Sequence, residues 1–129
     1  MSVVYVEPGK PARTAEIGSS LPELQAAVGG CIETFYPFEE EVCIICNEEA
    51  KINGMELNRG IHGKDGELID IIAGPFLVCD CSGENFASLS QGQLERYKRM
   101  YFRPERFYKV NGTIIGVPYE IKDKETERS

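Results

Sequence analysis

Residues 39–49 read EEEVCIICNEE, and this stretch decides the fold. Its centre, residues 42–46, is an unbroken apolar run, and glutamates stand close to both of its ends. A short apolar run bounded by charges is typical of a strand that is buried on both faces. The sequence therefore predicts a fully buried strand here, and the rest of the chain is interpreted around it.

Further strands are predicted on either side of this run. They cover residues 3–7, 13–17, 31–36, 68–73, 76–81, 107–110 and 113–117. Asn111-Gly112 separates the last two and is a strong hairpin signal, because both residues tolerate positive φ. Residues 58–66 contain three glycines among charged residues, a composition that predicts an exposed loop.

Two helices are predicted from their first turns. Ser20 and Ser90 each stand three residues before a glutamate or glutamine, which is the spacing of a capping box. In the second helix, Leu94, Tyr97 and Tyr101 fall on one side and predict a buried stripe. The order of elements does not alternate regularly between strand and helix. It predicts an α+β domain with a mixed or largely antiparallel sheet, two short helices on one face and a C-terminal hairpin.

Length and cysteine content predict one cytoplasmic domain. The chain has 129 residues, which fits a single domain over residues 1–121 followed by a charged tail at 122–129 that we expect to be disordered. Its apolar runs are too short to cross a bilayer, and the N-terminus resembles a first strand rather than a leader peptide. Five cysteines without a regular framework indicate free thiols in a reducing compartment.

Charge is distributed unevenly along the chain. The net charge is −7, yet residues 94–109 hold six basic and two acidic side chains, against five basic and fifteen acidic ones in residues 1–93. An acidic body repels phosphates, so we expect neither direct nucleic-acid binding nor membrane binding. A local basic patch remains able to hold one anion.

The sulfur and imidazole groups do not form a recognisable reactive centre. Cys43 and Cys46 lie three residues apart, so on a strand they point to opposite faces and do not converge on one metal. His62 is the only histidine, and no partner motif accompanies it. We find no phosphate-cradling loop, dinucleotide fingerprint or nucleophile elbow. The sequence favours a protein without catalytic residues, metal or cofactor.

Two groups of side chains are candidates for binding. Arginines interleaved with aromatic residues suit a nucleotide-like anion, because guanidinium groups hold phosphate and aromatic rings stack on bases. The candidate ligand-binding residues are Arg59, Arg96, Arg99, Arg103 and Arg106. The candidate protein-binding residues are Glu39, Glu40, Glu41, Glu48 and Glu49.

Several short segments resemble a family of small proteins known as domain of unknown function 3846, encoded largely by phages and integrated conjugative elements. The resemblance lies in residues 6–10, 24–30, 32–33, 36–38, 46–49, 57–59, 70–74 and 106–108. Such families often occur near antirestriction genes, so the resemblance implies an accessory role in protecting a mobile element.

Two functions follow as expectations. The first is a non-enzymatic accessory protein that inhibits a host protein, such as a nuclease or restriction complex, by presenting carboxylates where DNA phosphates would bind. The alternative is a small-molecule binding protein that captures a nucleotide or other anion on its arginine and aromatic face.

Overall fold

A computed structural model describes residues 1–121, so the predicted charged tail at 122–129 lies outside the described residues. The described part of the chain contains nine strands and two helices. They are β1 (Ser2–Val6), β2 (Arg13–Glu16), α1 (Leu21–Val28), β3 (Ile32–Phe35), β4 (Val42–Asn47), β5 (Leu57–His62), β6 (Leu68–Ala73), β7 (Phe76–Asp80), α2 (Gln91–Met100), β8 (Glu105–Val110) and β9 (Thr113–Pro118).

Five of these strands form the central sheet. Their order is β2-β1-β7-β4-β3, and every neighbouring pair is antiparallel. All six residues of β4 are buried, as predicted for the apolar run at 42–46. The predicted α+β class with a largely antiparallel sheet is confirmed.

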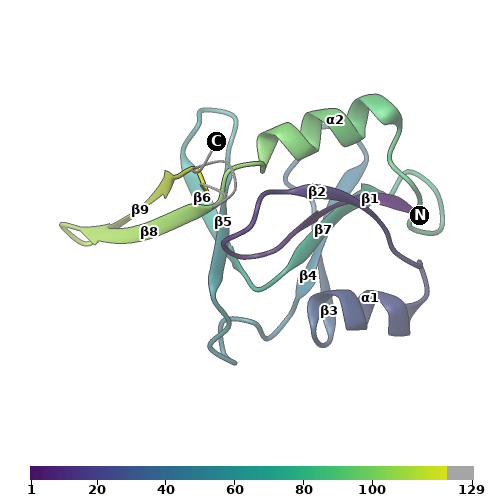
Figure 1. The fold of residues 1–129 in the computed structure, drawn as a ribbon, viewed down its shortest axis with the longest axis horizontal. Coiled ribbons are helices and arrows are strands. Elements are labelled where there is room, and N and C mark those ends of the chain that lie inside the picture. Colours follow the sequence, from purple (N-terminus) through teal and green to yellow (C-terminus); the bar gives the residue numbers. More distant parts are fainter. Residues whose placement is uncertain (122–129) are drawn as a thin grey trace, which may run out of the picture.

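The two helices cover opposite faces of the sheet (Figure 1). Leu24 of α1 packs in one core cluster with Ile45 and Leu77, whereas Tyr97 of α2 belongs to the other cluster with Ile44. The prediction that both helices share one face is therefore wrong. A strand that is apolar on both faces needs cover on both, and the sequence pattern does not say which helix covers which face.

Strand β5 replaces most of the exposed loop predicted for residues 58–66. It pairs antiparallel with β6, and Ile61 is buried in the core cluster on the α2 side. Gly60 does not mark a turn here: it lies within the strand, where a Cβ would come 2.5 Å from Cδ1 of Leu68, so a larger residue would require the Leu68 side chain to move. The turn begins only at Gly63, after the strand ends.

Helix α2 has the cap that its sequence predicts. Gln93 N–H donates to Oγ of Ser90 at 3.2 Å, and Ser90 N–H donates to Oε1 of Gln93 at 2.9 Å. Tyr97 and Tyr101 are 3% and 5% exposed, so the predicted stripe faces the core. The basic residues of α2 remain at the surface.

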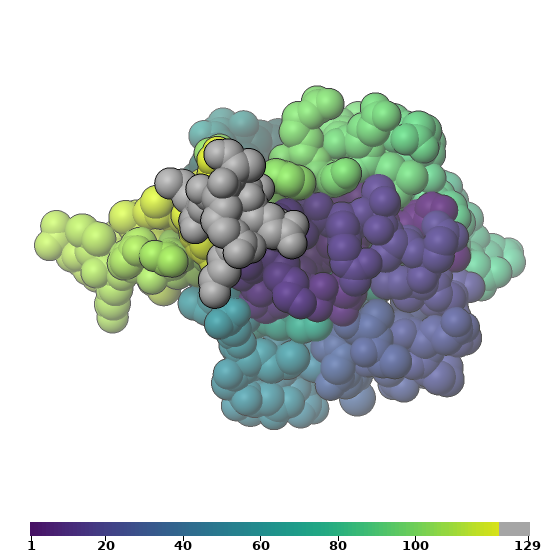
Figure 2. Space-filling view, in the orientation of Figure 1, coloured from purple at the N-terminus to yellow at the C-terminus, as the bar shows by residue number. Residues whose placement is uncertain are grey.

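Strands β8 and β9 form the predicted C-terminal hairpin, which we call the arm (residues 105–118). Its turn residues Asn111 and Gly112 have φ of 50° and 81°, the positive values that a tight hairpin turn requires. The arm extends away from the rest of the molecule (Figures 1 and 2).

A search for membrane-spanning segments finds, within residues 1–121, no helix with the length and apolar content needed to cross a bilayer.

Candidate functional site: a basic groove beside helix α2

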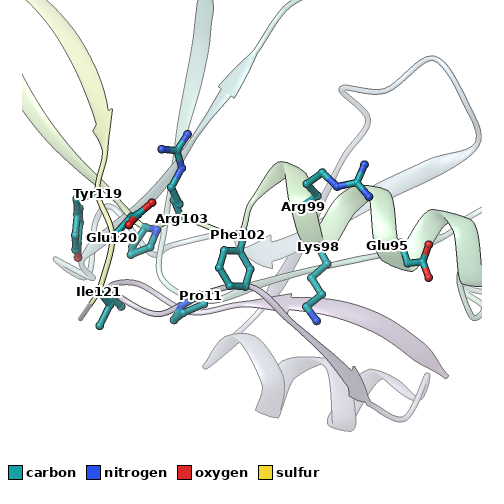
Figure 3. Close-up of a pocket in the computed structure, with 10 residues that line it drawn as sticks. Pro11, Glu95, Lys98, Arg99, Phe102, Arg103, Tyr119, Glu120 and Ile121 are labelled. Atoms are coloured by element: carbon teal, nitrogen blue, oxygen red, sulfur yellow. The ribbon is translucent and has the colours of Figure 1, made fainter. Parts of the chain in front are cut away.

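A groove of about 790 Å³ runs along the C-terminal half of α2 to the base of the arm (Figure 3). Its lining residues are Pro11, Glu95, Lys98, Arg99, Phe102, Arg103, Pro104, Tyr119, Glu120 and Ile121. Figure 3 shows Phe102 and Pro11 near the middle, Lys98 along the helix and Tyr119 at the far end. We call this the basic groove.

The cations of the basic groove come from the surface side of α2 and the segment that follows it. Lys98, Arg99 and Arg103 make no ion pair with a carboxylate within residues 1–121. Phe102 is 47% exposed in the groove. Cations beside an exposed aromatic ring suit an anion that carries a planar group.

The groove lining also contains two carboxylates, Glu95 and Glu120. Glu95 accepts a hydrogen bond from Nε2 of Gln91 at 3.4 Å, one turn earlier on the helix. Three cations against two carboxylates leave a small positive excess on a protein whose net charge is −7. The groove is therefore a local basic site on an acidic molecule.

The structure brings only some of the predicted arginines together. Arg99 and Arg103 line the basic groove. Arg106 is close to it, because its guanidinium lies 4.5 Å from the centre of the Tyr119 ring. Arg96 is engaged elsewhere: its Nη2 lies 2.8 Å from Oε1 of Glu40.

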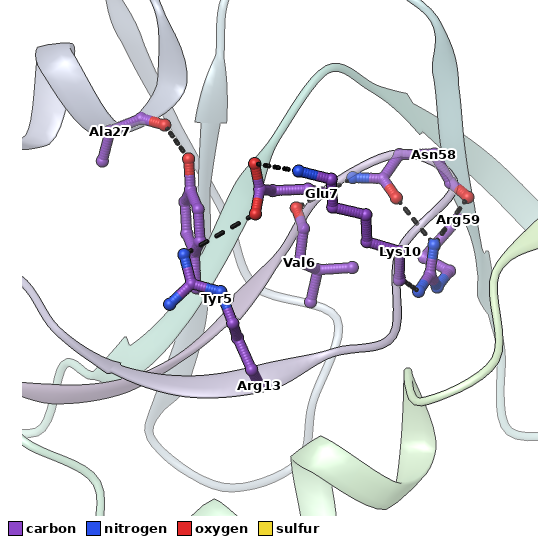
Figure 4. A network of polar contacts seen from close by, with 8 residues as sticks. All are labelled: Tyr5, Val6, Glu7, Lys10, Arg13, Ala27, Asn58 and Arg59. Atoms are coloured by element: carbon purple, nitrogen blue, oxygen red, sulfur yellow. Dashed lines mark hydrogen bonds and ion pairs between the residues drawn. The ribbon is translucent and has the colours of Figure 1, made fainter. Parts of the chain in front are cut away.

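Arg59 does not reach the groove surface, which corrects its assignment as a ligand-binding residue. It is fully buried, and its Nε donates to the Tyr101 carbonyl at 3.0 Å. Its Nη2 donates to the Lys10 carbonyl at 2.6 Å and its Nη1 to Oδ1 of Asn58 at 2.9 Å (Figure 4). Desolvation by burial lowers the pKa of this guanidinium.

Arg59 instead acts as a positioning residue for the basic groove. Two of the main-chain carbonyls that it binds, those of Lys10 and Tyr101, stand directly before two lining residues, Pro11 and Phe102. Ala12 N–H also donates to the Phe102 carbonyl at 3.3 Å, which joins the same two segments. The buried guanidinium thus holds together the turn after β1 and the end of α2.

The predicted protein-binding glutamates divide into two groups at the two ends of β4. Glu39 pairs with Nζ of Lys64 at 2.8 Å, and Glu40 accepts hydrogen bonds from Arg96 and the Tyr97 hydroxyl. The other three carboxylates make no ion pair within residues 1–121. They are Glu41, Glu48 and Glu49, all exposed. The six buried residues of β4 separate Glu41 from Glu48.

The thiols are arranged as the strand pattern predicts. Cys43 and Cys46 lie in the two different core clusters, on opposite faces of the sheet. Cys43 Sγ is instead 3.8 Å from Cys79 Sγ on the neighbouring strand. Hydrogen bonding to Cys79 and burial raise the pKa of the Cys43 thiol, and burial raises that of Cys46 to about 11. The raised pKa values keep the Cys43 and Cys46 thiols protonated at neutral pH, so these two behave as small apolar side chains.

A second, smaller cleft of about 490 Å³ lies beneath the base of the arm. It is lined in part by His62, Tyr101 and Glu105. Gly60 N–H donates to Oε1 of Glu105 at 3.2 Å, and burial raises the pKa of this carboxyl. Within residues 1–121, His62 makes no hydrogen bond to Glu105 or to a thiol.

Several groove residues are not among the candidate ligand-binding residues chosen from the sequence. Lys98 and Phe102 belong to the basic and aromatic stretch that contains the candidate arginines, and Tyr119 follows it closely. The run of basic and aromatic residues was therefore a signal that could have identified them. Pro11 had none, because its place in the groove depends on the contact between the β1–β2 turn and the end of α2.

Comparison with protein families finds that the model of a domain of unknown function, DUF3846, matches residues 1–102. The central sheet, both helices and the helical part of the basic groove lie within the matched residues, and the arm lies outside them. Searches of curated proteins and of solved structures find no match.

Proposed function

This chain belongs to the DUF3846 family, whose description assigns no activity, and we propose from its geometry that it is a non-enzymatic protein that binds a nucleotide-like anion in the basic groove. The observation that carries the proposal is that Lys98, Arg99 and Arg103 all line one groove and make no ion pair within residues 1–121. On a molecule with a net charge of −7, such a cluster leaves cationic charge available to a ligand.

The chemistry of the residues that line the groove supports the binding of an anion that carries a planar ring. Guanidinium groups form paired hydrogen bonds with phosphate oxygens, and Lys98 adds a point charge. Phe102 and Tyr119 offer aromatic rings on which a base can stack, a contact worth about 1–3 kcal/mol per base. Phosphate and base together therefore suit this groove better than either alone.

Thermal denaturation with a panel of nucleotides tests the proposal. A ligand at about 100 times its Kd stabilises the native state by roughly 2.7 kcal/mol, which raises Tm by several degrees in a domain of this size. Inorganic phosphate and a neutral nucleoside in the same panel separate the contribution of charge from that of stacking.

A pair of matched variants assigns the binding to the groove. Arg99→Ala combined with Arg103→Ala should abolish the nucleotide shift. Lys64→Ala combined with Lys109→Ala also removes two positive charges, but at positions outside the groove, and should preserve the shift in Tm. If no nucleotide in the panel changes Tm, or if both variants respond alike, the proposed groove function is wrong.

A second proposal concerns a protein partner. We propose that the exposed carboxylates Glu41, Glu48 and Glu49 contact a basic surface on a host protein, as expected of a cytoplasmic anti-defence protein of a phage or mobile element. The observation favouring it is that none of the three has a cationic partner within residues 1–121. Oppositely charged surfaces accelerate association and set specificity.

Capture from host lysate tests this second proposal. Wild-type protein should retain a partner at low salt and release it at high salt. A variant with Glu41, Glu48 and Glu49 changed to lysine should retain nothing, whereas an equal change at Glu16, Glu23 and Glu84 should not matter. If wild-type protein captures no partner at low salt, the acidic surface is not an inhibitor.

A further inference from the structure

The cleft beneath the base of the arm, which we call the Glu105 cleft, differs in its chemistry from the basic groove. Its titratable lining residues are Glu105, His62 and Tyr101, and the other lining residues are apolar or glycine. The two hollows have no lining residue in common within residues 1–121. A ligand that suits the cations of the groove is therefore not the ligand that suits this cleft.

Two glycines leave room for the Glu105 carboxyl at the cleft wall. A Cβ at Gly116 would lie 2.9 Å from Oε1 of Glu105, and a Cβ at Gly60 would lie 3.3 Å from the same oxygen. Gly60 N–H also donates a hydrogen bond to this oxygen at 3.2 Å. The carboxyl group is therefore fixed close to the backbone of both β5 and β9.

The Glu105 carboxyl is partly removed from water without gaining a cation. The residue is half-buried and makes no ion pair within residues 1–121. Its second oxygen, Oε2, accepts no hydrogen bond from this part of the chain. Burial raises the pKa of the carboxyl, although the Gly60 N–H, Arg59 and His62 oppose this effect. A carboxylate in this state is stabilised by a ligand that brings a positive charge.

Arg59 does not serve as the counter-ion. Its guanidinium donates to the Tyr101 and Lys10 carbonyls and to Oδ1 of Asn58. It makes no ion pair with Glu105, and burial outweighs its effect on the pKa of that carboxyl. The hydrogen bonds of Arg59 thus hold it to the main chain and leave Glu105 able to pair with a cation from solution.

We propose that the Glu105 cleft binds a small primary alkylamine, whose ammonium group pairs with the Glu105 carboxylate. Such an amine is charged at neutral pH, as the lysine side chain is. An ammonium group needs only one carboxylate oxygen, whereas a guanidinium fork engages two, and Oε1 already accepts from Gly60. His62 Cε1 would lie 3.4 Å from a Cβ at Gly60, so the imidazole stands beside the carboxyl as a second polar group.

The apolar lining residues suit the alkyl chain of the ligand. Phe38 and Met100 line the cleft, and Met100 is 54% exposed. The Phe38 ring also offers a face that attracts a cation. The volume of about 490 Å³ falls within the range of roughly 300–1,000 Å³ that is typical of small-molecule sites. The net charge of −7 favours the approach of a cation over that of an anion.

Three ligands with four-carbon chains test the proposal by NMR titration at constant ionic strength. Butylamine should move the amide signals of Gly60, His62 and Gly63 saturably, with a Kd on the order of 1 mM, as expected for so few atoms. Butanol should bind at least about tenfold more weakly, and butyrate should not bind. Equal responses to all three, or no saturable response to butylamine, would overturn the proposal.

Butylguanidine tests the preference for an ammonium group. It carries the same charge on the same alkyl chain, so a difference from butylamine reports on the shape of the cation. We expect it to bind several-fold more weakly than butylamine. Equal or tighter binding would show that the cleft does not select a primary amine.

Two glutamine substitutions assign the amine to the cleft. Glu105→Gln keeps an oxygen that can accept from Gly60 N–H but removes the charge, and should weaken butylamine binding at least about tenfold. Glu56→Gln removes the same charge at an exposed position outside the cleft and should leave the Kd unchanged. If the two variants bind butylamine equally well, Glu105 is not the residue that recognises it.

A further variant separates this site from the basic groove. The protein with Arg99→Ala and Arg103→Ala should bind butylamine with the wild-type Kd, because neither residue lines the Glu105 cleft. Loss of amine binding in this variant would show that the cleft is not an independent site and would overturn the proposal. Retained amine binding would support it whether or not the groove binds a nucleotide.

Discussion

Residues 42–46 (VCIIC) and residues 113–117 (TIIGV) are both short, uncharged, β-rich runs, yet the first is buried on both faces and the second is open to solvent. Strand β4 lies within a five-stranded sheet with a helix on each face. Strand β9 lies in a two-stranded arm. Apolar composition therefore predicts that a segment forms a strand, but what covers the strand depends on the rest of the chain or on a partner.

The largest expected difference between the two regions is in the free energy of unfolding. Leu77→Ala leaves a cavity in a fully buried part of the central sheet and should lower this free energy by about 3 kcal/mol. Ile115→Ala, on the exposed arm, should change it by about 0.5 kcal/mol or less in dilute protein. Urea denaturation measures both. Equal losses would show that the arm is packed as tightly as the sheet.

Arg59→Leu should have the next largest effect, because Arg59 joins the segments that form the basic groove. The substitution leaves the Lys10 and Tyr101 carbonyls without their donor in the interior, at a cost of about 2–3 kcal/mol. Arg99→Leu, at the surface, should cost about 0.5 kcal/mol or less. Denaturation of the two variants provides the comparison. If Arg59→Leu is as mild as Arg99→Leu, the buried guanidinium does not hold these segments together.

Titration of Glu105, at the junction of the arm and the body, should produce the smallest of the three effects. It should make the free energy of unfolding depend on pH. Burial raises the pKa of this carboxyl above its ordinary value of 4.5, so the folded state binds the proton more tightly than the unfolded state. Its contribution to stability is fully present below the unfolded pKa and is lost as pH rises through the folded pKa. Relative to Glu105→Gln, the wild type should therefore lose stability as pH rises above about 4.5.

Denaturation of both proteins over a pH series checks this sign. A difference between wild type and Glu105→Gln that stays constant with pH would mean that the carboxyl titrates normally. A difference that grows in favour of the wild type at higher pH would mean that a positive charge stabilises the ionised form more than burial destabilises it.

Local signals in the sequence predicted the local parts of the fold. The N-cap at Ser20, the capping box at Ser90, the buried tyrosines of α2 and the Asn111-Gly112 hairpin all depend on residues a few positions apart, and the structure confirms them. The reciprocal half of the box predicted at Ser20 differs, because the Glu23 carboxylate accepts from the Ser20 hydroxyl at 2.6 Å. Strand β5 was missed because Gly60 resembles a loop residue, although it lies within the strand and close to the Leu68 side chain.

Features that depend on residues far apart in the chain were harder to predict from the sequence. The basic stretch after Leu94 was recognised, but which of its residues line the groove depends on how α2 lies against the β1–β2 turn. Arg59 was grouped with the surface arginines because a charged residue between glycines and polar residues is usually exposed. Its burial depends on carbonyl groups 42 and 49 residues away. No local sequence pattern predicts contacts between residues so far apart in the chain.

The central claim is that the basic groove is the ligand site of this chain. Amide chemical shifts recorded by NMR during titration with adenosine triphosphate test it at the level of single residues. We expect the shifts to move at residues 98–103 and 119–121, with the largest changes beside Phe102 and Arg103. Changes confined to the cleft at His62 and Glu105, or no saturable change anywhere, would contradict it.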